Sequence, residues 1–217
     1  MPDRCELEVQ KLSTHLNNLK IIINRKVTAY NRDLDVIYMF QTLYLDEERG
    51  VKDIYFNFSR DREDNLIFII FDIASFVNYG DGSIRLYSYH EKINDLDKDY
   101  LKYMGHSLKL DLKYERKPIN YCLWGNNFKP KGHMLICDFN SKHRNLGHGT
   151  FAISNLEPII NIINKNIDYD DHLITNIIAI NGLVSAGSGI SHDELVAFYN
   201  KNGYPTVENN RYIYKEI

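Results

Sequence analysis

The stretch RNLGHGTFAIS, residues 144–154, decides how the second half of this chain is expected to fold. It follows the apolar run HMLICDF, residues 133–139, which has the length and composition of a buried strand. The two glycines leave the backbone N–H groups uncovered, and the apolar residues after them predict a helix. Because a helix N-terminus carries unpaired donors and a partial positive charge, this strand, turn and helix predict an anion-binding site.

Downstream of this turn, the pattern predicts a strand, a helix and a closing hairpin. These are LITNIIAI at 173–180, SHDELVAFYNK at 191–201, and two short strands flanking ENN at 208–210. Ser191 and Glu194 have the spacing of a capping box, and Gly203 is typical of a left-handed helix end.

Pro158 interrupts the helix that should begin at the glycine turn, because proline removes a helical hydrogen bond. Two interpretations follow. Either one kinked helix runs to about Lys165, or a short turn ends near Ser154 and a second helix begins there, with Ser154 and Glu157 as its cap.

Upstream of the turn, the pattern predicts helices and then strands. Apolar residues recur at helical spacing from Leu7 to Leu45, and the polar residues near Asn31 suggest a break between two helices. Their apolar faces must be covered by the core or by another chain. The later runs predict strands at 53–58, 66–71, 83–89, 108–114 and 119–124, with a short helix at 94–104.

Composition excludes several classes of protein. The 217 residues are 44% apolar and 25% charged, which is typical of a globular protein. The net charge of -3 gives no excess of positive charge of the kind that binds nucleic acid. The three cysteines form no CxxC pair, and His133, His143 and His148 lie on different predicted elements, so we expect no metal. No run is long enough to span a membrane, and the N-terminus lacks a signal pattern, so we expect a cytoplasmic protein.

A family resemblance appears around the glycine turn. Arg144, Gly147 and Gly149 match the pattern R-x-x-G-x-G between a strand and a helix, and FYNKNGY at 198–204 follows on a later helix. Over about residues 106–217 the chain resembles the GNAT N-acetyltransferase superfamily. The resemblance implies an α/β fold with a mixed sheet and an acyl-CoA-binding core at 106–217. Residues 1–105, with their helices and small β meander, are then either a substrate-side part of that domain or a partial second domain.

The resemblance also implies an activity, the transfer of an acetyl group from acetyl-CoA to a small-molecule or peptide amine. Tyr199 matches the position of the general acid that protonates the departing thiolate. Asn181 follows as a cofactor- or substrate-binding residue, and Arg144 would add charge at the loop. The backbone N–H groups that would hold the pyrophosphate belong to Leu146, Gly147, His148, Gly149 and Thr150.

Other readings stay open at this point. No general base can be identified, because Asp138, His133 and His143 lie near a strand end and no sequence pattern indicates a catalytic role for them. Deprotonation of the amine through water is the simpler assumption. The chain could instead be a GNAT-like module that binds acyl-CoA without catalysis. It could also be an interaction protein whose N-terminal helices pair with a partner or with a second copy in a homodimer.

Overall fold

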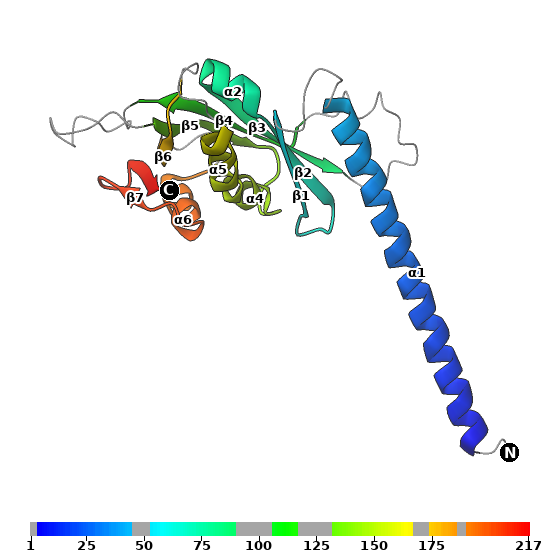
Figure 1. Cartoon of the computed structure of the whole chain (residues 1–217). Helices are drawn as coiled ribbons and strands as arrows, with labels where there is room; N and C mark the ends of the chain where they lie inside the picture. Colours follow the sequence, from blue (N-terminus) through cyan, green and yellow to red (C-terminus); the bar gives the residue numbers. More distant parts are fainter. Residues whose placement is uncertain (1–3, 45–52, 90–105, 117–131, 167–173, 186–189) are drawn as a thin grey trace.

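In the computed structural model the chain forms one mixed eight-stranded sheet with helices packed on it, which confirms the predicted α/β class (Figure 1). The structure describes residues 4–44, 53–89, 106–116, 132–166, 174–185 and 190–217. The strands are β1 (Ile54–Arg60), β2 (Leu66–Asp72), β3 (Asp81–Tyr89), β4 (Leu108–Glu115), β5 (Gly132–Ser141), β6 (Ile177–Leu183), β7 (Thr206–Val207) and β8 (Tyr212–Glu216). The helices are α1 (Arg4–Tyr44), α2 (Ile73–Tyr79), α4 (His148–Ser154), α5 (Leu156–Asn166) and α6 (His192–Lys201).

The strands lie in the order β1-β2-β3-β4-β5-β6-β8-β7. Neighbours are antiparallel except β5 and β6, which run parallel. A parallel pair needs a long crossover connection, and α4 and α5 provide it. The predicted strand at 119–124 and the predicted helix at 94–104 lie outside the described residues.

Both faces of the sheet are buried near β2, which explains its unbroken apolar run. Alternate residues point to opposite faces. Ile67, Ile69 and Phe71 belong to the main core, beneath α2, α4, α5 and α6. Phe68 and Ile70 belong to a second cluster, which contains Val36 and Ile37 of α1.

The helices predicted between Leu7 and Leu45 form a single helix, α1, so the break expected near Asn31 is wrong. No proline or glycine occurs between Arg4 and Tyr44, and one polar residue of middling helix propensity does not end a helix. Figure 1 shows α1 extending far from the sheet and meeting it only near its C-terminal end.

Pro158 lies in the first turn of α5, where its missing N–H costs nothing. The second interpretation, two helices, is therefore confirmed. The predicted cap is wrong, because the Ser154 hydroxyl donates to the carbonyl of Phe151. Asn155 joins the two helices instead. Its side-chain oxygen accepts from the Tyr55 hydroxyl, and its side-chain nitrogen donates to the carbonyl of Phe151.

Several local predictions in the last third are confirmed. The Ser191 hydroxyl accepts from the Glu194 N–H, and Gly203 has a φ of 79°. Glu208, Asn209 and Asn210 all have positive φ and form the turn of the final hairpin. One helix was not predicted: α2 has Asp72 as its N-cap, whose carboxylate accepts from the Ser75 N–H, and the left-handed Gly80 as its C-cap.

Candidate active site

The central feature of the site is the point where β5 and β6 separate. The two strands pair in parallel from Gly132 and Ile177 as far as Ile136 and Gly182. Beyond Ile136, β5 continues along β4 to Ser141, whereas β6 ends at Leu183. Among the described residues, no strand therefore pairs with this edge of β5 beyond Ile136, and its backbone groups face an opening.

A β-bulge lies at the same place. Asp111 of β4 pairs with Asp138, and the next residue, Leu112, pairs with Ile136, so Cys137 is an extra residue in β5. A bulge bends its strand and reverses which residues face the core. Before it, Met134 and Ile136 face the main core, and after it Phe139 does so. The bulge therefore turns the end of β5 away from β6.

The opening is a cleft of about 860 Å³. It is bounded by the second half of β5, the turn before α4, the chain that follows β6, and α6. The residues that line it are Ile136, Cys137, Asp138, Phe139, Asn140, Ser141, His143, Arg144, Asn145, Gly149, Leu183, Ser185, Ile190, Glu194, Leu195, Ala197, Phe198 and Tyr199.

Tyr199 lines this cleft from α6. Its side chain is only 3% exposed, and its ring packs edge-on against Phe198 at 5.4 Å between centroids. Burial raises its pKa to about 12, so the phenol stays protonated at neutral pH. None of the hydrogen bonds between described residues involves its hydroxyl, which leaves the O–H available to a molecule in the cleft.

The predicted anion-binding residues divide into two groups. Arg144 and Gly149 line the cleft. Leu146, Gly147, His148 and Thr150 belong to the same turn but do not line it. Gly147 is the N-cap of α4 with a φ of 89°, a left-handed conformation that explains a glycine there, and nothing would lie within 4 Å of an added Cβ.

Gly149 is required for a different reason. A Cβ at this position would lie 3.0 Å from the ring of Phe139 and 3.2 Å from that of Phe198. These two rings, from β5 and α6, stack with centroids 5.6 Å apart. The glycine therefore lets α4 approach the aromatic pair at the wall of the cleft, so a larger residue would disturb the packing of the cleft as well as its backbone.

A buried pair that sequence reasoning did not identify holds the turn in place. His148 Nε2 lies 3.3 Å from Asp61 Oδ2, and both side chains are fully buried. The N–H of Arg62 also donates to the carbonyl of Leu146 at 3.1 Å. The loop between β1 and β2 thus anchors the glycine turn, and the His148 side chain points away from the cleft toward Asp61.

The Asp61 carboxylate is a strong acceptor in this position. Burial alone would raise its pKa, but the hydrogen bonds from Asn65, from His148 and from the N–H of Glu63 together outweigh it and bring the pKa below its usual value. Asp61 is therefore ionised at neutral pH and organises the β1–β2 loop around itself.

Asn181 does not line the cleft. It lies within β6, opposite Leu135 and Tyr214, with 1% of its surface exposed. Neither end of its buried amide has a hydrogen-bond partner among the described residues. Such an amide normally costs free energy, so it marks a place where a partner is expected.

Two carboxylates and one histidine line the cleft, and none is an obvious general base. Asp138 accepts from the N–H of Phe139 at 2.8 Å, and His143 lines the turn. Glu194 is engaged in the capping box, whose hydrogen bonds from Ser191 lower its pKa. His133, which was also considered as a base, does not line the cleft: it is fully buried and lies against Tyr214.

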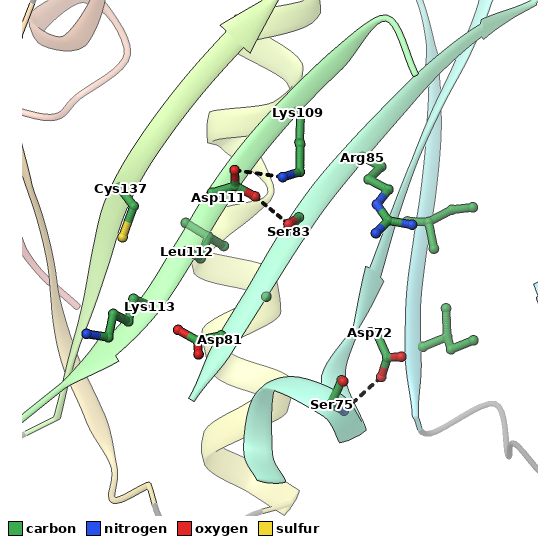
Figure 2. Close-up of a pocket in the computed structure, with 13 residues that line it drawn as sticks. Asp72, Ser75, Asp81, Ser83, Arg85, Lys109, Asp111, Leu112, Lys113 and Cys137 are labelled. Atoms are coloured by element: carbon green, nitrogen blue, oxygen red, sulfur yellow. Dashed lines mark hydrogen bonds and ion pairs between the residues drawn. The ribbon is translucent and has the colours of Figure 1, made fainter. Parts of the chain in front are cut away.

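A second concavity, of about 540 Å³, lies over β3 and β4 (Figure 2). One ion pair lies within it: Asp111 accepts from Lys109 at 2.8 Å, and it also accepts from the Ser83 hydroxyl. Burial would raise the pKa of Asp111, but these hydrogen bonds lower it overall. Cys137 is the described residue that lines both concavities.

Within the described part of the chain, no three histidine, cysteine, aspartate or glutamate side chains converge in a way that could hold a metal ion. None of the described helices combines the length and the apolar character that crossing a membrane requires.

Comparison with known proteins gives little. No family model matches the chain, and no curated protein matches it in sequence. Among solved structures, a crystal structure of a mutant of KacT matches at 8% identity and a TM-score of 0.40, covering 63% of this chain and 71% of that one.

Proposed function

We propose that this chain is an N-acetyltransferase that transfers an acetyl group from acetyl-CoA to an amine. The observation that carries the proposal is the opening between the parallel strands β5 and β6, with the protonated Tyr199 facing it. A thioester lying in this opening would have the free edge of β5 on one side and the phenol on the other. The glycine turn lies at its mouth.

The cofactor needs a site for its pyrophosphate and one for its pantetheine arm. Arg144 lines the cleft and would supply positive charge, while the first N–H groups of α4 would add donors. The free edge of β5 beyond Ile136 would bond the amide groups of the arm, much as a further strand would.

Tyr199 would act on the departing sulfur. A thiol has a pKa of roughly 8.5, so full proton transfer from a phenol with a pKa of about 12 is uphill. The phenol would therefore donate a hydrogen bond as negative charge develops on sulfur, and the proton that finally resides there would come from the attacking amine.

Water would take the proton from the amine and pass it on to the thiolate sulfur, so that the products are the amide and the free thiol of CoA. Asp138 and His143 line the cleft and would orient such a water, since each presents a polar group to it. The acceptor would be a small-molecule or peptide amine in the cytoplasm. No metal is needed, because the phenol and the strand edge would provide the polarisation.

A calorimetric titration of the full chain with CoA tests the cofactor site. We expect saturable binding that weakens in Arg144→Ala, with Lys142→Ala as a matched control because Lys142 is a neighbouring cation that does not line the cleft. Absence of CoA binding by the folded wild-type chain would contradict the proposal.

Release of free thiol from acetyl-CoA, measured with a panel of amines, then tests catalysis. Binding of CoA without thiol release for any amine would favour the inactive binding module instead. Mass spectrometry of the acceptor distinguishes acetyl transfer from hydrolysis, because only transfer adds the acetyl group to the amine.

A further inference from the structure

The exposed apolar surface of this protein is concentrated on α1. Nine of the thirteen large apolar side chains that are exposed in the described part of the chain belong to this helix. They are Leu16, Leu19, Ile21, Ile22, Ile23, Val27, Tyr30, Leu34 and Tyr38. A soluble globular surface seldom gathers aliphatic side chains in this way, so the helix is expected to be covered by something.

Seven of the nine form one band, which we call the apolar stripe. Its members, separated by three or four positions, are Leu16, Leu19, Ile23, Val27, Tyr30, Leu34 and Tyr38. At about 100° per residue these positions fall on one side of the helix over roughly 33 Å of its length. Their exposed fractions run from 41% for Leu19 to 70% for Tyr38.

The stripe is distinct from the face of α1 that meets the sheet. That face contains Asp33, which pairs with Arg60, and Val36, which is fully buried. At the helical angle, Asp33 and Val36 lie a quarter of a turn or more from the middle of the stripe. Ile37, which is 7% exposed, forms the edge of the docked face beside the stripe, whereas Leu34 is 44% exposed. The sheet therefore borders the stripe where α1 docks but leaves its members exposed.

We propose that the stripe pairs with the same stripe of a second copy, in an antiparallel arrangement centred near Val27. The spacing of its members reads almost the same in both directions about Val27. Reversal brings Leu16 level with Tyr38, Leu19 level with Leu34, and Ile23 level with Tyr30, within one residue in each case. A surface that matches its own reverse is what a two-fold interface requires.

Charge complementarity favours the antiparallel direction. The charged residues between positions 20 and 32 are all basic, whereas Asp33 and Asp35 follow them. In a parallel pair, every charged residue would lie level with the same residue of its copy, so Lys20 would meet Lys20 and Asp35 would meet Asp35. In the antiparallel pair, Lys20 of each copy lies level with Asp35 of the other, on the same flank of the stripe, which gives two opposite-charge contacts.

The antiparallel arrangement also separates the two sheets. Each sheet meets its own α1 near Asp33 and Val36, and reversal about Val27 places the two docking points on opposite sides of the two-fold axis, roughly 22 Å apart along the helices. A contact of two helices over this length is at the small end of specific interfaces, so we expect dissociation in the micromolar range. The inference does not depend on the proposed enzymatic function.

Sedimentation velocity of the full chain, over low to high micromolar concentrations, tests the dimer. Val27→Asp would place two carboxylates together near the two-fold axis, and we expect the dissociation constant to rise at least about a hundredfold. Ile21→Asp is the matched control, since Ile21 is 50% exposed on the far side of the helix, and it should leave the dissociation constant unchanged.

The direction of pairing has its own test. Lys20→Glu alone should weaken the dimer, and Lys20→Glu combined with Asp35→Lys should restore it if these residues meet. Circular dichroism confirms that each variant keeps its helix. A chain that is monomeric at every concentration, or equal effects of Val27→Asp and Ile21→Asp, would overturn the proposal, and failure of the double variant to recover would overturn the antiparallel direction.

Discussion

Replacing Tyr199 with phenylalanine separates a catalytic role of this residue from a structural one. The change removes the hydroxyl and keeps the ring, which packs against Phe198 in the wall of the cleft. None of the hydrogen bonds between described residues uses this hydroxyl, so its loss should change the free energy of unfolding by less than about 1 kcal/mol. For a chain of this size that is a shift of at most about 2–4 °C in melting temperature.

The effect on catalysis should be far larger. A positioned hydrogen-bond donor to developing negative charge typically contributes on the order of 100- to 1,000-fold, so the turnover number should fall by about that much while CoA affinity changes little. The rise of the Tyr199 pKa from 10.0 to about 12 corresponds to about 3 kcal/mol against ionisation. The turnover number of the wild type should accordingly lose no activity through ionisation of Tyr199 until about pH 11.

Tyr204→Phe provides the matched control. Tyr204 is 2% exposed, does not line the cleft, and its hydroxyl donates to the carbonyl of Ile153 at 3.1 Å. Removing that hydroxyl should lower stability by about 1 kcal/mol and leave turnover intact. Thiol release and melting temperature are measured for both variants. Full turnover by Tyr199→Phe with a lowered melting temperature would refute the reasoning.

Three further substitutions test how the glycine turn is held. Gly147→Ala should lower the free energy of unfolding by about 1–2 kcal/mol in urea titrations, because φ is 89° although the site is open; unchanged stability would mean that the turn relaxes. Gly149→Ala should weaken CoA binding in calorimetry, because its Cβ would lie only 3.0 Å from the Phe139 ring and would displace that ring in the wall of the cleft. Retained affinity would argue against that packing. Asp61→Asn should be less stable than the wild type at pH 7. Folding lowers the pKa of Asp61, so the stability lost in Asp61→Asn is fully expressed above an ordinary aspartate pKa of about 4. This loss shrinks as the pH falls through the lower pKa of Asp61 in the folded state. A loss of stability that does not change with pH would contradict the assignment.

Features that depend on neighbouring residues were predictable from the sequence alone. The capping box needs Ser191 and Glu194 three positions apart, and the left-handed end needs only Gly203. The alternation of β4 and the apolar run of β2 were equally readable, because side chains alternate along a strand. Helix α2 has the same kind of signal in Asp72 and Gly80, although only the strands on either side of it, at 66–71 and 83–89, were predicted.

Tertiary structure decided what joins distant parts of the chain. His148 contacts Asp61, which lies 87 positions away, and the sequence around either residue does not predict this contact. The bulge at Cys137 exists only because β4 and β5 pair in a particular register, and that bulge opens the cleft. The length of α1 could be inferred from the absence of proline and glycine in its sequence. Only the folded structure shows that the sheet covers Val36 and leaves the apolar stripe exposed. Propensity and spacing act over a few residues, whereas registers, bulges and buried pairs depend on which segments pack together.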